Sequence, residues 1–228
     1  MLAAGATFFE GVGYIPDFLC HFDGSDGATS ATDEGGHSLT FVGNAQLDTA
    51  QKKFGTASLL LDGSGDWVSA PNHADFLFGA GPFTVDLFFR RAAVNTSQLC
   101  GVFGTSTCWR ILVSSNNLLF QYSENGTDIF TPISATPGTI GTGTWFHVAA
   151  DRNEAGLLRL YADGVMLGSD TVTADFFDGT NDFHIGASSN GSNRNYFNGH
   201  IDEVRVIKGL ALYDDDGGFT PPASPFLP

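Results

Sequence analysis

The clearest alternation of apolar and polar side chains lies in residues 144–169, TWFHVAADRNEAGLLRLYADGVMLGS. Between residues 146 and 151 every second side chain points to the same side of an extended chain, which is the period of a half-buried strand. A polar turn at 153–156 leads to a second such run, in which leucines alternate with Arg159 and Tyr161. Asp163-Gly164 then indicates a tight hairpin turn, because a type I′ turn needs positive φ at both central residues. The stretch predicts three consecutive antiparallel strands.

Short apolar runs separated by turns rich in glycine, asparagine and serine continue along the rest of the chain. We expect these further strands at residues 18–23, 39–42, 45–47, 58–61, 67–70, 83–91, 99–103, 109–113, 118–122, 128–133, 165–172, 183–187 and 196–207. Short helical turns are expected at 71–78, capped by Asn72, and at 209–213. No sustained helical period and no repeat of solenoid length occurs in the sequence. The pattern predicts an all-β protein, an antiparallel two-sheet jelly-roll sandwich.

The chain of 228 residues fits one large β domain, which we place at residues 18–228 with a Pro-rich C-terminal tail. Residues 1–17 show no clear period. Their apolar side chains, Phe8, Phe9, Tyr14 and Ile15, favour an arm that docks on a partner or a neighbouring subunit. The alternative is a disordered terminus.

The charge balance is strongly acidic, with 10 Lys and Arg against 25 Asp and Glu, a formal net charge of −15. Neutralising nucleic-acid phosphates or an anionic membrane surface requires clustered basic residues, so we expect neither partner. No apolar run is long enough to insert into a bilayer. The N-terminus lacks a basic start and contains Glu10 and Asp17, so it does not resemble a secretory signal. Either a processed signal is missing, or the protein is made in a cytoplasm and leaves by another route, such as assembly into a phage particle that is released by lysis.

Three cysteines cannot all pair within one chain. Cys100 and Cys108 could face each other across a hairpin centred near Gly104, but two reduced, buried thiols are the favoured interpretation for a protein made in a cytoplasm. Cys20 is expected in the core.

Four segments carry a resemblance to a known family. They are HFDG at 21–24, KFGTASLLLDGSGDW at 53–67, WFHVAADRNEAGLLRLYADG at 145–164 and FNGHIDEVR at 197–205. In this order they resemble the laminin G-like, concanavalin A-like jelly roll over most of the chain. With the ending FTPP at 219–222, the sequence is similar to the subtype found in phage structural proteins and bacterial surface proteins. The family is functionally broad, so the fold alone does not fix the function.

Glycoside hydrolases share this fold, and a retaining enzyme needs two carboxyl groups roughly 5 Å apart on one face. The glutamates show no Glu-x-Asp-x-x-Glu-like spacing, and Asp202 and Glu203 are neighbours that should point to opposite faces. No Ser-His-Asp arrangement, phosphate loop or zinc-type His/Cys spacing is present, and the six histidines are scattered. We therefore predict a protein that does not catalyse a reaction.

A calcium ion is the metal that the resemblance implies, because related jelly rolls often carry one. Asp23 ends the first predicted strand and Asp202 lies in the last, and these strands lie near each other in such sandwiches. We expect these two carboxylates, with loop carbonyls, to bind Ca²⁺. The alternative is that Asp23 caps the Gly24 turn and Asp202 pairs with an arginine.

Sugar binding needs exposed aromatic rings together with amide, acidic and arginine side chains for the hydroxyl groups. The polar loop 188–196 has this composition, although turns are rich in such residues in any case. Trp145, at the start of a central strand, is expected in the core. The candidate ligand-binding residues are Asn190, Asn193, Arg194 and Tyr196 of the loop, joined by Trp67, Tyr122 and Asn125.

These observations together predict a non-catalytic structural or adhesion component of a phage virion, such as a decoration, tail or fibre-associated protein. We expect its partners to be other virion proteins, gripped by the arm, a cell-surface glycan and further copies of itself in a homo-oligomer. The expected location is the virion. The alternative is a secreted or periplasmic carbohydrate-binding module, found outside the cell, and a glycosidase ranks third.

Overall fold

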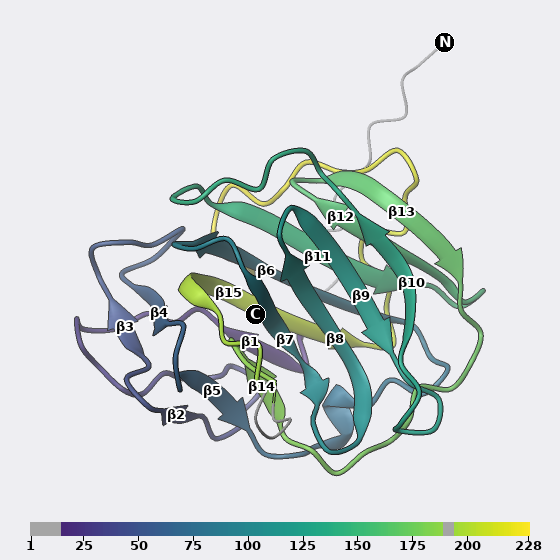
Figure 1. The fold of residues 1–228 in the computed structure, drawn as a ribbon, viewed down its shortest axis with the longest axis horizontal. Helices are drawn as coiled ribbons and strands as arrows, with labels where there is room; N and C mark the ends of the chain where they lie inside the picture. Colours follow the sequence, from purple (N-terminus) through teal and green to yellow (C-terminus); the bar gives the residue numbers. More distant parts are fainter. Residues whose placement is uncertain (1–14, 189–193) are drawn as a thin grey trace.

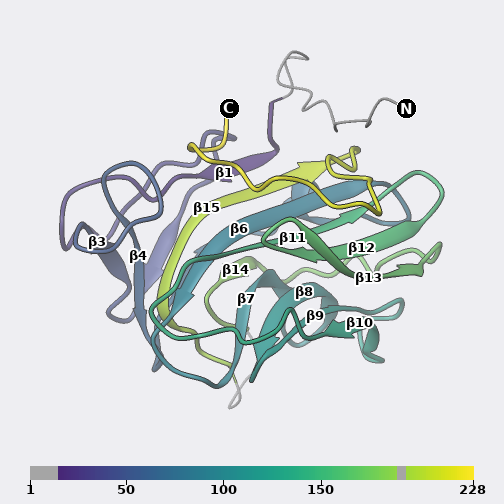
Figure 2. The ribbon, with the colours of Figure 1, turned by 90° about the horizontal axis from the view of Figure 1, so that it is seen from above.

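The computed structural model describes residues 15–188 and 194–228. Two antiparallel sheets pack face to face, as the two layers in Figure 2 show. The 8-stranded sheet has the order β13 (Val165–Thr171), β12 (Leu157–Ala162), β11 (Phe146–Arg152), β6 (Phe83–Arg91), β15 (Asn198–Lys208), β4 (Ser58–Asp62) and β3 (Gln46–Asp48), and β1 (Phe18–Cys20) pairs with β15. The 7-stranded sheet has the order β10 (Phe130–Ala135), β9 (Asn117–Tyr122), β8 (Thr107–Ser114), β7 (Thr96–Phe103), β14 (Phe183–Ile185), β5 (Trp67–Ala70) and β2 (Thr40–Val42). The predicted all-β sandwich of two antiparallel sheets is confirmed.

The core lies between the two sheets and follows the predicted alternation. Phe83, Val85, Leu87 and Phe89 of β6 all point into it, because alternate residues of a strand share a face. Strand β6 lies near the middle of its sheet, between β11 and β15 (Figure 1). Its core side chains are therefore shielded on both sides.

The stretch 144–169 forms β11, β12 and β13, as predicted. Asp163 (φ 47°) and Gly164 (φ 78°) both have the positive φ of a type I′ turn between β12 and β13. The segment N-terminal to this hairpin differs from the prediction in one respect. Trp145 is half-buried and packs on the outer face of the 8-stranded sheet, beside Phe88 and Phe226, and not in the inter-sheet core.

The C-terminal tail covers the outer face of the 8-stranded sheet, where the yellow segment crosses it in Figure 2. Tyr213 stacks on Phe219 with 3.7 Å between ring centroids. Its hydroxyl donates to Asp86 Oδ2 at 2.5 Å, and Arg205 makes two hydrogen bonds to the same carboxylate at 2.9 and 2.7 Å. The pKa of Asp86 is lowered to about 2: burial raises it, and the charge and hydrogen bonds of Arg205 outweigh that effect. The tail is thus an integral layer of the domain.

Two expected helical turns have different outcomes. A 3-10 turn, η1 (Ala74–Phe76), forms within 71–78, but His73 caps it, and Asn72 donates instead to the carbonyls of Gly179 and Asn181. Residues 209–213 form no helical turn. Their backbone groups bond instead to side chains of the sheet: Thr84 Oγ1 donates to Leu210 O and accepts from Leu212 N, and Asp151 Oδ2 accepts from Tyr213 N.

The three cysteines lie within the described residues and are buried, and none forms a disulfide there. Burial raises the pKa of the Cys108 thiol to about 11. Residues 1–14 of the predicted arm lie outside the described residues. In the parts of the chain that are described, no helix is both long and apolar enough to cross a membrane.

Candidate ligand-binding face

The outer face of the 7-stranded sheet carries a polar row that crosses its central strands. Strand register places Gln121, Arg110, Gly101, His184 and Ser69 opposite one another on β9, β8, β7, β14 and β5. The residues that alternate with them point into the core. With strands about 4.8 Å apart, the row is roughly 19 Å long. Gly101 has no side chain, so it leaves a gap in the row between Arg110 and His184.

Arg110 is fixed on one side of this gap. Its Nε donates to Gln121 Oε1 at 2.8 Å, and its guanidinium lies 3.4 Å from the ring centroid of Phe103. Burial lowers the pKa of Arg110 to about 10, so it stays charged at neutral pH. Its Nη1 is buried and has no hydrogen-bond partner among the described residues. Among the described residues, Arg110 Nη1 is therefore a buried donor without a partner.

His184 lies on the other side of the gap and is 6% exposed. Burial lowers the pKa of its imidazole to about 4, which leaves the ring neutral at physiological pH. Its Nδ1 has no hydrogen-bond partner within the described part of the chain. A neutral imidazole can donate from one nitrogen and accept at the other, so His184 has the chemistry to pair with a hydroxyl group, although its Nδ1 is itself buried.

Trp67, Arg194 and Tyr196 form an aromatic and cationic cluster next to His184. Trp67 projects outward from β5, and the other two precede β15 in the chain. The ring centroids of Trp67 and Tyr196 are 6.3 Å apart, and the Arg194 guanidinium carbon lies 4.7 Å from the centroid of the indole ring. The Trp67 and His184 centroids are 6.2 Å apart. All three cluster residues are partly exposed, so the cluster is accessible from solvent.

This cluster unites three of the seven candidate binding residues, but two others lie elsewhere. Tyr122 points into the inter-sheet core, where its ring stacks on Phe176 at 4.6 Å and Phe130 at 5.3 Å. It sits on β9, four strands away from Trp67 on β5. Asn125 is exposed in the turn after β9, and its Oδ1 accepts from the backbone N–H groups of residues 127 and 128. The fold therefore does not bring all the candidate residues into one site. Asn190 and Asn193 lie outside the described residues.

The sequence analysis missed His184, Arg110 and Gln121. Each alternates with core residues on its strand, which was a usable signal that it faces outward. What the sequence does not contain is the order of the strands. Gln121 and Arg110 are neighbours through the β8–β9 hairpin, but His184 joins their row only because β14 inserts between β7 and β5.

The two carboxylates expected to bind calcium both hold one backbone loop. Asp202 Oδ2 accepts from the N–H groups of Lys53 at 2.7 Å and Phe54 at 3.2 Å, and Asp23 Oδ1 accepts from the N–H and hydroxyl groups of Thr56. These contacts also differ from the alternative prediction, in which Asp23 caps the Gly24 turn and Asp202 pairs with an arginine. Burial raises the pKa of Asp202 to about 8, which favours a neutral carboxyl group at physiological pH. Among the described residues, neither carboxylate belongs to a group of three or more side chains that could hold a metal ion, and calcium binding stays a prediction.

Asp202 and Glu203 also correct the expectation that neighbouring strand residues point oppositely. Ile201 and Val204 on either side of them both pack in the core. An irregularity in β15, with Glu203 at φ 54°, turns both carboxyl groups to the same outer face. The pair is nevertheless buried, at 0% and 1% exposure, and Glu203 accepts from His21 and from the backbone of Phe226 in the tail. A substrate cannot reach this carboxylate pair.

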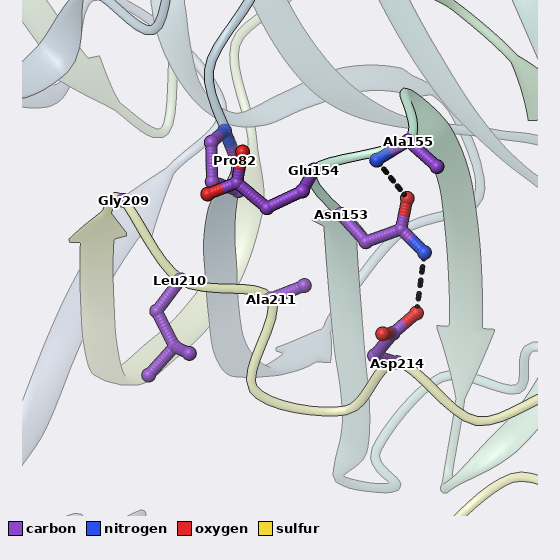
Figure 3. Close-up of a pocket in the computed structure, with 8 residues that line it drawn as sticks. All are labelled: Pro82, Asn153, Glu154, Ala155, Gly209, Leu210, Ala211 and Asp214. Carbon is purple, nitrogen blue, oxygen red and sulfur yellow. Dashed lines mark hydrogen bonds between the residues drawn. The ribbon is translucent and has the colours of Figure 1, made fainter.

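A separate surface hollow is drawn in Figure 3. It lies between the β11–β12 turn and the start of the tail, and Asn153 donates to Asp214 at its edge. Its lining residues are Pro82, Asn153, Glu154, Ala155, Gly209, Leu210, Ala211 and Asp214. None of these is aromatic, so the hollow offers no ring for stacking, unlike the Trp67 cluster.

Comparison with known families identifies the fold. A laminin G-like family model, described as the concanavalin A-like lectin/glucanases superfamily, matches residues 62–215, more than half of the chain. No curated protein matches the sequence.

Three solved structures show the same fold at low sequence identity. The binding domain of botulinum neurotoxin serotype G matches with a TM-score of 0.67 and 10% identity, over 87% of this chain and 49% of that one. A structure of botulinum neurotoxin type C, described as dependent on two ganglioside molecules to enter cells, gives 0.62 and 15%, over 82% and 47%. This chain thus spans about half the length of the toxin structures. Domain 4 of AbnA, an extracellular GH43 arabinanase from Geobacillus stearothermophilus, in complex with arabinotriose, gives 0.65 and 20%, over 86% and 94%.

Proposed function

Because the chain belongs to the concanavalin A-like lectin/glucanases superfamily, we propose that it binds a carbohydrate on the outer face of the 7-stranded sheet and does not act on it chemically. The observation that carries this proposal is the cluster of Trp67, Arg194 and Tyr196 beside the unpartnered nitrogen of His184. The cluster is the recognition element, and the polar row across β14, β7 and β8 extends it.

The chemistry of these groups suits a sugar. Aromatic rings contact the apolar face of a pyranose or furanose, and a few placed polar groups fix its orientation through the hydroxyls. Arg194 and Arg110 supply N–H donors, and His184 supplies a neutral ring that can donate or accept. Arg194 covers one face of the indole, so a bound sugar contacts the indole and the guanidinium together or displaces the latter.

The two outer faces of the sandwich differ in accessibility. The tail covers the outer face of the 8-stranded sheet, where Phe226 and Tyr213 are buried against it. The Trp67 cluster on the opposite sheet remains partly exposed. This contrast supports the 7-stranded sheet as the face that meets a ligand.

The structural neighbours support a binding role for a domain of this shape. Two are named as parts of neurotoxins, one a binding domain and one tied to gangliosides, and the third holds arabinotriose. None of the three is named as a catalytic domain, which agrees with the burial of Asp202 and Glu203.

A glycan array followed by calorimetry tests the proposal. Probes are arabino-oligosaccharides, including arabinotriose, and ganglioside head groups, with and without Ca²⁺. For a glycan that binds, Trp67→Ala and Tyr196→Ala are expected to weaken affinity at least about tenfold, the equivalent of 1.4 kcal/mol. Trp145→Ala is the matched control, because it removes a half-buried indole from the opposite face and leaves affinity unchanged. An array without any bound glycan, or equal affinity for wild type and Trp67→Ala, would overturn the proposal.

We further propose that this face is displayed on a phage particle, with the domain present in several copies and residues 1–17 gripping another virion protein. The support is the sequence resemblance to phage structural proteins. Density-gradient sedimentation of lysate from the native source tests it. Migration of the chain with intact particles is expected, and a wholly soluble chain would favour the alternative, an extracellular carbohydrate-binding module.

A further inference from the structure

Two histidines and an aspartate converge at one end of the sandwich, away from the Trp67 cluster. His37 lies between β1 and β2, whereas His73 and Asp75 lie at the start of η1. His37 Nε2 is 3.2 Å from Asp75 Oδ2, and His73 Nδ1 is 3.0 Å from the same oxygen. One ligand atom from each residue fits within a group whose members are all less than 4.8 Å apart. The three residues come from two segments that lie far apart in the chain.

His37 is oriented by a buried carboxylate. Its Nδ1 lies 2.7 Å from Asp33 Oδ2, and Asp33 is itself held by the backbone N–H groups of Leu19 and His37. The ring packs against Phe76, with 4.9 Å between centroids. A carboxylate on one nitrogen fixes the tautomer of an imidazole and directs the lone pair of the other nitrogen, which is the arrangement found behind metal-binding histidines.

When the proton of a neutral His37 is on Nδ1, its Nε2 is a hydrogen-bond acceptor and faces a second acceptor, the carboxylate of Asp75. Its Nε2 lone pair faces the carboxylate oxygen of Asp75 at 3.2 Å. His73 Nδ1 lies 3.0 Å from the same carboxylate oxygen and accepts weakly from the Asp75 backbone N–H at 3.4 Å. A proton on His73 Nδ1 or a metal ion between the three side chains would each satisfy this arrangement.

The donor set selects the metal. Two imidazole nitrogens and one carboxylate oxygen suit Zn²⁺, whereas Ca²⁺ takes oxygen ligands alone. In a tetrahedral zinc site with bonds of about 2.0 Å, the ligand atoms lie about 3.3 Å apart. The separations of 3.0 and 3.2 Å to Asp75 are close to that value. Three protein ligands leave the fourth position for water.

We propose that His37, His73 and Asp75 bind a zinc ion that clips the segment between β1 and β2 to η1. The site adds a link just beyond the β2–β5 pairing, where Thr40 lies opposite Ser69. Asp33 acts as the positioning residue, since it contacts His37 and is not a ligand. The zinc clip is independent of the carbohydrate-binding face.

The test is a zinc titration of the full chain after chelator treatment, measured by competition with a chromophoric chelator. One Zn²⁺ per chain is expected, together with a rise in the thermal midpoint. His73→Gln should weaken affinity at least tenfold without unfolding the chain, because this side chain is 55% exposed. His21→Gln is the matched control: it also removes a histidine paired with a carboxylate, Glu203, but lies outside the group. Affinity in this variant stays at the wild-type value.

Cobalt provides a second readout that does not depend on stability. Co²⁺ bound by wild type is expected to show the intense visible absorption of a four-coordinate site, lost in His73→Gln and in Asp75→Asn. Excess Ca²⁺ should not displace it. Absence of stoichiometric zinc binding, or equal zinc affinities for His73→Gln, His21→Gln and wild type, would overturn the proposal.

Discussion

At the scale of single residues, the buried acid Asp202 couples stability to pH. Burial raises its pKa from 3.8 to about 8. The unfolded chain releases this proton near pH 4, whereas the folded chain keeps it up to about pH 8. Between these values the folded state binds more protons, so stability is fully present below about pH 4 and is lost as pH rises to about 8.

Asp202→Asn should remove this dependence. The amide keeps an oxygen acceptor for the N–H groups of Lys53 and Phe54 and carries no charge at any pH. The free energy of unfolding, measured in urea at pH 5 and pH 8.5, should fall less in the variant than in wild type, by on the order of 4 kcal/mol. Asp178→Asn, at an exposed position, should behave as wild type. An equal fall in the Asp202 variant and wild type would show that this carboxyl group is ionised in the folded chain at neutral pH.

Residue types alone predicted part of the candidate site. Trp67, Arg194 and Tyr196 were identified from their chemistry, and the fold brings them together. Tyr122 has equally suitable chemistry but points into the core. The alternation along 117–122 shows that this strand has two faces but not which of them meets the other sheet. Residue type and periodicity therefore could not distinguish the buried Tyr122 from the partly exposed Trp67 and Tyr196.

At the scale of elements, the β12–β13 turn also serves as the docking point of the tail. Gly164 O accepts from Phe219 N at 2.8 Å. A Cβ atom on Gly164 would overlap the carbonyl oxygen of Phe219, and φ there is +78°. Glycine is therefore required twice, by the turn and by the close approach of the tail.

Comparing two alanine substitutions separates these requirements. Gly138 has φ +98°, and no atom lies within 4 Å of the position that a Cβ would occupy, so Gly138→Ala should cost only the strain of positive φ, about 1 kcal/mol. Gly164→Ala should cost about 3 kcal/mol, since the tail must also shift. Urea denaturation measures both values. Equal losses would mean that the tail does not rest on the turn.

The end of the tail is anchored by a single aromatic side chain. Phe226 packs on Leu19 and Phe88, and the Arg205 guanidinium carbon lies 4.0 Å from its ring centroid. Phe226→Ala should destabilise the fold by about 2–3 kcal/mol. Leu227→Ala, at a neighbouring position that is 61% exposed, should change stability by less than about 0.5 kcal/mol. Glycan affinity should be unaffected by either change. A loss of glycan affinity in Phe226→Ala would indicate that the ligand binds the outer face of the 8-stranded sheet instead.

At the scale of the whole molecule, the alternation of side chains predicted the sandwich and most of its strands. The β11–β13 hairpins follow from local turn chemistry, and the four strands β7 to β10 form the expected meander. The irregularity at Glu203 and the closure of one outer face by the tail were not predicted. Both depend on long-range contacts, Glu203 with Phe226 and Asp86 with Tyr213, that leave no period in the sequence.

The two outer faces differ in role in this account: one is sealed by the chain's own tail, and the other binds a carbohydrate. The three tryptophans report on this difference, because each has one indole N–H resonance in a nitrogen-15 correlation spectrum. Trp67 lies on the proposed binding face, and Trp109 is buried with its N–H donated to Phe76 O at 2.7 Å. Trp145 lies on the opposite outer face.

The most direct measurement is therefore a titration of the labelled chain with arabinotriose and with ganglioside head-group oligosaccharides, with each indole peak assigned by its Trp→Phe variant. The account predicts a saturable shift of the Trp67 resonance while those of Trp109 and Trp145 stay in place. A saturable shift confined to Trp145, or no shift at Trp67 with any of these sugars, would contradict the assignment of carbohydrate binding to the 7-stranded sheet.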